Sequence, residues 1–459
     1  MSNIPKIIKK QRKYFNSHAT RDVDFLRGRL NALRSELILQ EQAIYEALEN
    51  DFNKPPFETY LSEFGIVMSE IDLFLKKIKS WTKPKRVLPA LLSFPTSDFI
   101  YKDPYGTVLI IAPWNYPFQL AIAPLIAAIA AGNTVVLKPS ELTPNTSQLV
   151  HDMVSKIFAP EHAMVIQGGI PIATELLSQR WDYIFFTGSV PVGKIVAKAA
   201  AEHLTPVTLE LGGKSPCIVD DTVPINLVAK RLVWGKFLNA GQTCIAPDYL
   251  IVHSKIKYDL IEALKKRIIS VYGANPESSP DLAHIVNSKN LDRLKHYLEG
   301  ETILHGGGSN AQSNFLEPTL IDEPELDSAV MSDEIFGPIL PILAYDDIED
   351  IKVIVNQYEK PLSFYIFSNN KSFRKQLLKF FSFGGGVIND TLIHFGNKKL
   401  PFGGVGHSGM GAYHGKHGFD TFIHKKGIVK KGNWLDIPIR YAPYKGKMPL
   451  LKRLFKLLS

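Results

Sequence analysis

Cys244 is one of only two cysteines among the 459 residues of the chain, and it lies in the segment FLNAGQTCIAP at residues 237–247. A thiolate is a strong nucleophile, so a cysteine in a loop can attack a carbonyl carbon. Gly241 lets the backbone approach a ligand closely, and Pro247 ends any helix that would carry the sulfur into a core. The alternative is a free cysteine that packs as a small hydrophobic residue, which is the commoner case. Cys244 is therefore a candidate nucleophile whose partners lie elsewhere in the chain.

Glu210 stands in TLELGGK at residues 208–214, where a short strand pattern ends in an acid and two glycines. A carboxylate between leucines is not typical of a solvated face, and burial raises a carboxyl pKa toward the range of a general base. The alternative is a buried acid paired with Lys214. The second cysteine, Cys217, lies within an apolar strand pattern and is predicted to belong to the core.

A glycine-bearing turn, FTGSVPVGK at residues 186–194, follows an apolar strand and opens a helix. Gly188 and Gly193 flank the predicted helix start. A strand, a glycine-rich turn and a helix N-terminus form an anion site that suits a dinucleotide pyrophosphate. The spacing is not G-x-G-x-x-G, and an ordinary tight turn also uses glycine, so both interpretations stay open on these residues alone.

Composition and charge restrict the class of protein. The chain is 45% hydrophobic and 21% charged, which is typical of a globular protein with two or three domains. Two cysteines cannot form a disulfide framework and no signal-peptide pattern opens the sequence, so a cytoplasmic location is expected. The net charge of +8 comes from residues 421–459, which hold ten Lys/Arg and one acid. The body of the chain therefore lacks a nucleic-acid-binding charge pattern, and the scattered histidines predict no metal site.

Alternating strand and helix patterns predict an α/β fold. Residues 104–137 carry no charge, but prolines interrupt the run, and it divides into a strand at 107–112, a helix at 118–131 and a strand at 134–137. This is a βαβ unit of a buried parallel sheet rather than a membrane span. Helices are predicted before residue 82, further strand and helix units after residue 149, and a second α/β domain after Ser215.

Three other segments have distinct patterns. Residues 85–105 predict a projecting strand pair or an extended connection, and the glycine-rich segments 383–387 and 401–411 predict chain returns. The last eleven residues, PLLKRLFKLLS, place six apolar residues on one broad helical face and three basic residues on the other.

Seven motifs stand in the order and at the spacing of the aldehyde dehydrogenase superfamily, which the chain resembles over roughly residues 20–425. They are PWN (113–115), KPSE (138–141), FTGS with Gly193, ELGGK (210–214), GQTC (241–244), EIFGP (334–338) and PFGGVGHSGMG (401–411). The short N-terminus, HLTPVTLELGGKSPC and AYHGKHGFDTF resemble the class 3, or fatty aldehyde, branch.

The resemblance implies an aldehyde dehydrogenase-like α/β fold with a Rossmann-type cofactor domain, an α/β catalytic domain and a small oligomerisation element that pairs two subunits into a homodimer. The expected division is residues 1–82 with 106–209 for the NAD(P)-binding domain, 210–418 for the catalytic domain, 83–105 with 419–434 for the bridging element, and 435–459 for a basic amphipathic tail. The tail is expected to pack on its own protein or a dimer mate near the substrate mouth, or to lie on an anionic membrane.

The resemblance also assigns roles to residues. Cys244 matches the nucleophile, Glu210 the base that activates water, and the Asn115 side chain with the Cys244 backbone N–H matches the oxyanion hole; the surroundings of Cys244 are expected to activate its thiol. The matching cofactor-binding residues are Trp114, Lys138, Glu141, Gly188, Ser189, Gly193, Glu334 and Phe336. A carboxylate at Glu141 favours NAD, yet class 3 relatives often accept NADP, so the choice stays open.

The expected reaction is NAD(P)-dependent oxidation of a medium- or long-chain apolar aldehyde, of fatty or isoprenoid type, to the acid. Small or aromatic aldehydes are the alternative substrates. A CoA-acylating relative would usually lack the acid at Glu210, and a cysteine hydrolase would need a histidine near the sulfur. A structural homologue without activity would be expected to have lost Cys244, Glu210 or Asn115. No nucleic-acid partner and no metal are expected.

Overall fold

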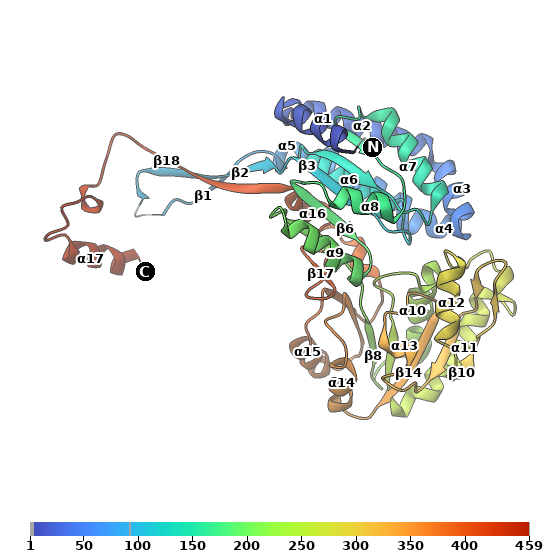
Figure 1. The fold of residues 1–459 in the computed structure, drawn as a ribbon. Helices are drawn as coiled ribbons and strands as arrows, with labels where there is room; N and C mark the ends of the chain where they lie inside the picture. Colours follow the sequence, from blue (N-terminus) through green and yellow to red (C-terminus); the bar gives the residue numbers. More distant parts are fainter. Residues whose placement is uncertain (1–3, 91–92, 459) are drawn as a thin grey trace.

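Two open sheets and a long projecting arm make up the computed structural model, which describes residues 4–90 and 93–458 (Figure 1). The first sheet has six strands and the second has seven. A three-stranded sheet forms the arm. The predicted α/β fold is confirmed.

The first sheet is parallel except for its edge strand β17. In order across the sheet, its strands are β17 (Gly409–Met410), β7 (Val207–Glu210), β6 (Tyr183–Thr187), β3 (Thr107–Ile111), β4 (Thr134–Lys138) and β5 (Ala163–Val165). All five residues of β3 and of β4 are buried, because helices cover both faces of the sheet. The predicted βαβ unit at residues 107–137 is confirmed.

Successive side chains of these strands point to opposite faces and meet different helices. Val108 and Ile110 belong to the core cluster of one face, whereas Leu109 and Ile111 belong to that of the other. The first face is covered by α2 (Val23–Leu39), α3 (Glu41–Phe52), α5 (Gly65–Trp81), α6 (Gln119–Ala130) and α7 (Pro144–Ile157). The second face is covered by α1 (Ile4–Asn16), α8 (Ile170–Leu177) and α9 (Val190–Ala201).

The uncharged segment before residue 138 is buried within the domain, and every residue of α6 is buried. Among the described residues, no helix combines the length and the apolar composition that a membrane crossing needs. The absence of charge therefore reflects burial on all sides of α6.

The second sheet is parallel except for its edge strand β10. Its strands, in order, are β10 (Thr302–His305), β13 (Thr319–Asp322), β14 (Ile339–Tyr345), β9 (Tyr249–His253), β8 (Pro216–Val219), β15 (Ser363–Phe367) and β16 (Gly385–Ile388). The helices around it are α10 (Ile225–Phe237), α11 (Lys257–Tyr272), α12 (Ser288–His296), α13 (Ala329–Ser332), α14 (Ile348–Val355) and α15 (Lys371–Phe380). A short hairpin joins β11 (Ser309–Asn310) to β12 (Phe315–Leu316). Cys217 is fully buried in β8, as predicted.

One glycine-rich segment was predicted incorrectly. Residues 385–388 form the edge strand β16 rather than a chain return. A Cβ on Gly386 would lie 2.3 Å from the carbonyl oxygen of Phe364, and one on Gly384 would lie 2.4 Å from that of Gly403. The glycines are thus needed because neighbouring backbones approach the strand closely.

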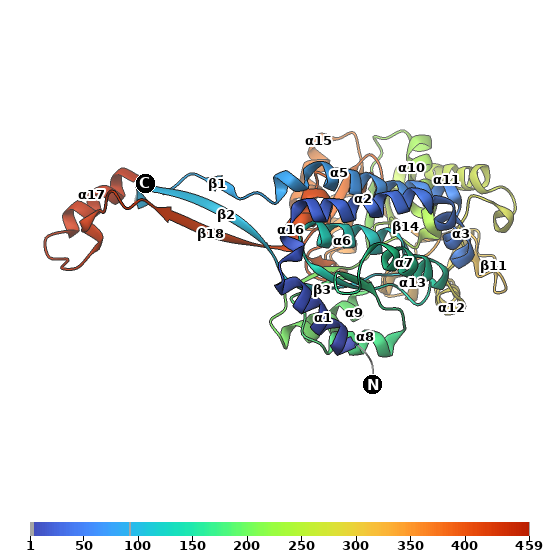
Figure 2. The ribbon, with the colours of Figure 1, turned by 90° about the horizontal axis from the view of Figure 1, so that it is seen from above.

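The arm joins two segments that are far apart in the sequence. β2 (Thr96–Pro104) pairs with β1 (Lys85–Val87) and, over nine residues, with β18 (Ile423–Lys431). After α16 (Gly415–Thr421), the chain runs out along β18 and ends in α17 (Met448–Leu458), at the far end of the arm and away from the body (Figure 2). The predicted projecting strands and terminal helix are confirmed. The division into domains stays a prediction, with β17 as the strand that crosses from the expected catalytic segment into the first sheet.

Candidate active site

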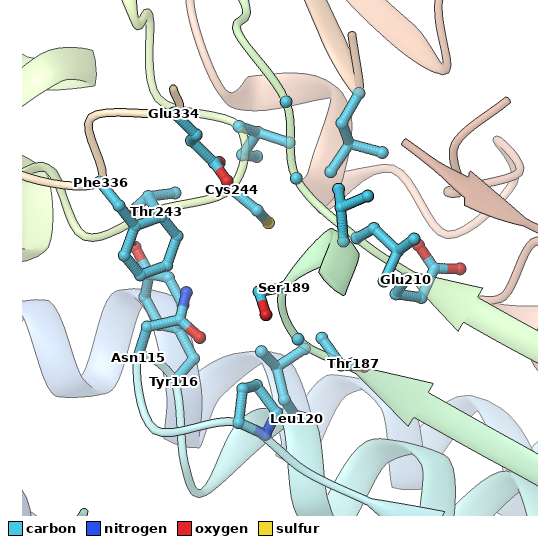
Figure 3. Close-up of a pocket in the computed structure, with 18 of the residues that line it drawn as sticks. Asn115, Tyr116, Leu120, Thr187, Ser189, Glu210, Thr243, Cys244, Glu334 and Phe336 are labelled. Atoms are coloured by element: carbon cyan, nitrogen blue, oxygen red, sulfur yellow. The ribbon is translucent and has the colours of Figure 1, made fainter. Parts of the chain in front are cut away.

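A cavity of about 990 Å³ contains most of the residues that the sequence singles out (Figure 3). Eight of the eleven predicted site residues line it: Trp114, Asn115, Gly188, Ser189, Glu210, Cys244, Glu334 and Phe336. They come from the end of β7, from loops that follow β3, β6 and α10, and from the loop before β14. The fold therefore brings together side chains that lie more than 200 residues apart.

Cys244 follows a strained turn at the end of α10. Asn239 and Ala240 have left-handed backbone conformations, with φ of 57° and 53°. Gly241 has a φ of 71°, and a Cβ there would lie 2.3 Å from the carbonyl oxygen of Gly337. The backbone is thus held tightly where the chain turns, and the partly exposed Cys244 side chain points into the cavity (Figure 3).

The environment raises the pKa of the Cys244 thiol. Burial is the main cause, and the nearby carboxyl groups of Glu334 and Glu210 add to it. The nearby backbone N–H groups of Cys244 and Ile245 act in the opposite direction because they favour the thiolate. The surroundings of Cys244 are apolar and acidic, and they disfavour the thiolate. The expectation that they activate the thiol was therefore wrong for the protein without cofactor.

Asn115 lies in the loop after β3 and is tied to the turn that precedes Cys244. Its Nδ2 donates to the carbonyl oxygen of Gln242 at 3.1 Å, and the Nδ2 of Asn239 donates to the carbonyl oxygen of Asn115 at 2.9 Å. An amide nitrogen carries two hydrogens, so the Asn115 amide keeps one for a further acceptor. Next to it, Tyr116 Oη and Thr243 Oγ1 lie 2.6 Å apart in a hydrogen bond.

Glu210 ends β7 on the other side of the cavity from Cys244 (Figure 3). The side chain is buried, and within the described chain neither carboxyl oxygen has a hydrogen-bond partner. Burial raises the pKa of Glu210 well above its usual range, as predicted from its apolar neighbours. The alternative pairing with Lys214 was wrong, because Lys214 Nζ donates instead to Asp248 Oδ2 at 2.8 Å and to two backbone carbonyls.

Glu334 and Phe336 project from the loop between α13 and β14. Glu334 packs on Gly212, where a Cβ would lie 2.1 Å from its Oε2. Burial and the nearby Asp248 raise the pKa of Glu334 to about 8. Phe336, with a φ of 49°, packs its ring at right angles to that of Trp114, at 5.2 Å between centroids. Glycine at 212 is thus what leaves room for the carboxyl group.

Gly188 and Ser189 form the turn between β6 and α9. A Cβ on Gly188 would lie 2.5 Å from the Phe186 ring, and Ser189, the N-cap residue of α9, makes no side-chain capping bond. The first N–H groups of a twelve-residue helix therefore face the cavity edge without a capping side chain, which suits a phosphate group. Gly193 lies within α9 rather than at the turn, and its missing side chain lets α9 pack on Leu211.

Lys138, the last residue of β4, and Glu141, in the loop that follows, lie outside the cavity. Lys138 Nζ and Glu141 Oε2 are 2.5 Å apart, with the lysine buried and the carboxylate partly exposed. Gly169, which precedes α8, lies beside the carboxylate. The pair thus sits at the carboxyl edge of the same parallel sheet as Gly188, the edge at which nucleotides bind in such folds.

The sequence did not single out the apolar wall of the cavity. It includes Leu61, Leu120, Trp234, Ile393, Phe402 and Tyr413. These residues come from separate segments whose apolar positions are indistinguishable from core residues in the sequence. Only the folded arrangement of these segments around the cavity identifies them.

Fold and cavity together are those of an NAD(P)-dependent dehydrogenase with a cysteine in the wall of its cavity. Residues 2–428 match the model of the aldehyde dehydrogenase family, and the chain belongs to this family. Its reaction is the NAD(P)+-dependent oxidation of an aldehyde.

Named relatives and a solved structure are similar over nearly the whole chain. The 4,4'-diaponeurosporen-aldehyde dehydrogenase of Staphylococcus aureus is 49% identical over 96% of this chain and 97% of that protein. The dimeric NADP-preferring aldehyde dehydrogenase of Rattus norvegicus is 40% identical over 98% of this chain and 100% of its own length. The substrate-bound structure of Staphylococcus aureus AldH superposes with a TM-score of 0.97 at 47% identity, covering 99% of this chain and 100% of the other.

Proposed function

We propose that Cys244 is the nucleophile of aldehyde oxidation and that Asn115 stabilises the resulting oxyanion. The Cys244 thiolate adds to the aldehyde carbon, and the carbonyl oxygen becomes the oxyanion of a thiohemiacetal. The free N–H of the Asn115 amide and the Cys244 backbone N–H donate to this oxygen. One such donor typically contributes a factor of about 10²–10³ to the rate. The observation that carries the proposal is the position of thiol, amide and buried carboxyl on one cavity.

Glu210 is the base for the second half of the reaction. When hydride has left the thiohemiacetal carbon, Cys244 holds the acyl group as a thioester. Glu210 takes a proton from water, the hydroxyl adds to the thioester carbon, and the carboxylic acid leaves as the thiol is restored. A carboxyl whose pKa burial has raised is a stronger base than an exposed one, and its oxygens are not engaged by other described groups.

The residues around the cavity fit NAD(P)+, which serves as the hydride acceptor when bound. The uncapped start of α9 after Gly188 suits the pyrophosphate, and Lys138 with Glu141 suits the adenosine ribose. Glu334 and Phe336, with Trp114, border the part of the cavity next to Cys244 and suit the nicotinamide ribose and ring. Glu141 accepts hydrogen bonds from ribose hydroxyls, so NAD is the expected cofactor. NADP is the alternative, because the rat relative is named as NADP-preferring.

The substrate is an apolar aldehyde of medium or long chain. Aliphatic and aromatic side chains, such as Leu120, Trp234 and Phe402, line the cavity beyond Cys244, and such a wall favours a hydrocarbon chain. The Staphylococcus aureus relative is named for a diaponeurosporen aldehyde, which is an isoprenoid. Both observations support a fatty or isoprenoid aldehyde over a small one.

The test is a chain-length series of aldehydes, from propanal to hexadecanal and an isoprenoid aldehyde, followed by the absorbance of the reduced nicotinamide. Each aldehyde is assayed with NAD+, with NADP+ and with or without coenzyme A. Turnover independent of coenzyme A, with kcat/KM rising with chain length, is expected. A requirement for coenzyme A would identify an acylating enzyme, and a preference for the shortest substrates would contradict the assignment to apolar aldehydes.

Two further proposals concern assembly and location. The chain forms a homodimer through the arm, as expected from the rat relative, which is named as dimeric. The tail binds the surface of an anionic membrane from the cytoplasmic side, because apolar side chains of α17 are exposed beside exposed Lys452 and Arg453. A membrane source would supply long apolar aldehydes to the cavity.

A further inference from the structure

Asn239 joins the two loops that carry Asn115 and Cys244. Its Nδ2 donates to the carbonyl oxygen of Asn115 at 2.9 Å and to that of Gln242 at 3.2 Å. The Gln242 carbonyl also accepts from Asn115 Nδ2 at 3.1 Å. Asn239 is fully buried and has a φ of 57°, a conformation that asparagine tolerates better than most residues. One side chain thus fixes the amide of Asn115 relative to the turn before Cys244.

Glu58 holds Asn239 in this conformation. Its Oε2 accepts the backbone N–H of Asn239 at 2.9 Å, although the two residues are 181 positions apart in the sequence. Burial raises the pKa of Glu58 to about 7. A carboxyl oxygen keeps lone pairs in both protonation states, and the carboxyl group can therefore accept this bond in either one. Glu58 lies in α4 (Pro56–Thr59), which belongs to neither of the two loops.

Lys54 and Glu63 brace the other side of Asn115. Lys54 Nζ and Glu63 Oε1 are 2.6 Å apart, and both side chains are completely buried. Glu63 Oε2 accepts the backbone N–H groups of Phe118 at 2.9 Å and Gln119 at 3.1 Å, at the start of α6. Lys54 Nζ also lies 4.1 Å from the centre of the Tyr116 ring. The loop of Asn115 is therefore anchored directly after its functional residue.

The same segment also forms part of the cavity wall. Residues Tyr60–Phe64 make a π-helical turn, a rare conformation that is frequent at functional sites. Glu63 points inward from this turn, whereas Leu61 and Ser62 line the cavity. A segment that lines the cavity with one face thus supports the loops of Asn115 and Cys244 with the other.

We propose that Asn239, Glu58 and the Lys54–Glu63 pair are positioning residues, which hold the Asn115 amide where the oxyanion forms. The proposal rests on the assignment of Asn115 as the oxyanion donor. Buried charges are costly unless each is paired and hydrogen-bonded. The side-chain hydrogen bonds of Asn239, Glu58, Lys54 and Glu63 end on the loop of Asn115, on the turn before Cys244 or within the Lys54–Glu63 pair. The network serves the step in which charge develops on oxygen, because a small displacement of a donor weakens its hydrogen bond to the oxyanion.

Two reactions of Cys244 without cofactor separate positioning from general damage. Acylation by p-nitrophenyl acetate passes through an oxyanion and is followed as the burst of p-nitrophenolate. Alkylation by iodoacetamide is a displacement at a saturated carbon, forms no oxyanion, and is followed as added mass on the protein. Asn239→Gly keeps the left-handed backbone and the N–H to Glu58 but removes the bridging amide. It should slow acylation about ten- to a hundredfold and leave alkylation within about twofold of the wild-type rate.

Further variants complete the comparison. Glu58→Ala should slow acylation selectively. Glu58→Gln should acylate at the wild-type rate, because the amide oxygen accepts the same N–H. Glu49→Ala, on the exposed face of α3, should have no effect. Asn115→Ala is the reference. If Asn115→Ala acylates at the wild-type rate, the assignment of the oxyanion donor fails. If Asn115→Ala is slow but folded Asn239→Gly acylates normally, or loses acylation and alkylation equally, the positioning role is overturned.

Discussion

Cys244 and two nearby carboxyl groups, those of Glu210 and Glu334, face the cavity, and the protein raises the pKa of each. Burial is the largest cause for Cys244, Glu210 and Glu334. The ammonium group of the nearby Lys214 donates its hydrogen bonds to Asp248 and to backbone carbonyls. In the protein without cofactor, the site therefore favours the neutral thiol and neutral carboxyl groups, although the proposed nucleophile and base both act when deprotonated.

The pH dependence of Cys244 reactivity follows from this environment. The thiolate reacts, and the pKa of the thiol is raised, so the alkylation rate should grow about tenfold per pH unit through the neutral range and be lost as the pH falls. Glutathione, with an unperturbed pKa near ~8.5–9, is the reference. Glu210→Gln removes a carboxyl group whose negative charge, once it ionises, raises the thiol pKa, so the variant should shift the profile to lower pH. A plateau below pH 8 in the wild-type protein would contradict this expectation.

Replacing the sulfur tests the nucleophile. Cys244→Ser should abolish aldehyde oxidation, because a hydroxyl needs a base to become a nucleophile and the carboxyl of Glu210 lies across the cavity. Binding of NAD+ should persist, since its proposed contacts are at Gly188, Lys138 and Glu334. Fluorescence titration with NADH measures binding, and absorbance measures turnover. More than about one per cent residual activity would mean that another residue is the nucleophile.

Replacing the base tests the second half-reaction. Glu210→Gln should release one equivalent of reduced nicotinamide and then stall, because hydride transfer does not need the carboxyl and hydrolysis of the thioester does. The stalled enzyme should carry the acyl mass on Cys244 in intact-protein mass spectrometry. Addition of hydroxylamine, which attacks thioesters without a base, should restore the free thiol. Steady turnover by the variant would show that another group activates the water.

Among the helices and strands, the sequence predicted those with a periodic or continuous apolar pattern. β3, α6 and β4 were predictable because buried parallel strands and a fully buried helix give apolar, uncharged runs, which Gly132 and prolines divide into separate elements. β16 was not, because Gly386 packs against Phe364 and the preceding Gly384 packs against residues 403–404, and only the fold creates these contacts. Secondary structure that depends on neighbouring backbone leaves no periodic signal.

The candidate site divides in the same way. Cys244 and Glu210 are distinctive in the sequence because a nucleophile in a glycine-bearing loop and an acid between leucines are unusual in themselves. Glu58 and Asn239 are not, because their hydrogen bond joins residues 181 positions apart. Lys214 shows the limit of local reasoning: its partner is Asp248, 34 residues away, rather than the neighbouring acid.

The arm leaves apolar side chains exposed to solvent. Within the described part of the chain no layer covers its three-stranded sheet, and Ile428, Val429 and Tyr101 are exposed on it. Such a sheet is marginal alone and gains stability when a second copy covers it. Light scattering should therefore give twice the chain mass of 51.3 kDa, and Ile428→Lys with Val429→Lys should shift the protein toward monomer. The variant Lys430→Ala with Lys426→Ala, which changes two exposed positions of the same strand, serves as the matched control. A wild-type monomer or tetramer would contradict the proposed dimer.

For the molecule as a whole, charge and shape are distributed unevenly. The body is nearly neutral, while the segment from Thr421 to the end holds ten Lys/Arg against Asp436. The arm carries most of this charge away from the body and ends in α17 (Figures 1 and 2). In the single chain, α17 does not pack over its own cavity, and Leu450 and Phe455 are each more than half exposed. A dimer mate or a membrane remains as the surface that covers this apolar face.

Truncation after Asp436 distinguishes these two surfaces. It removes α17 and six Lys/Arg, each worth about 1 kcal/mol near anionic lipid, so binding to phosphatidylglycerol vesicles should weaken at least tenfold. The KM for long-chain aldehydes should rise far more than that for propanal, because delivery from the bilayer is lost. Leu450→Ser with Phe455→Ser in the full chain should weaken binding while keeping the charge, and phosphatidylcholine vesicles should bind neither form strongly. If the full chain does not bind anionic vesicles but the truncation still raises the long-chain KM, α17 covers a dimer mate instead. If vesicle binding and the chain-length preference are both unchanged in the folded truncation, the tail has no part in substrate delivery.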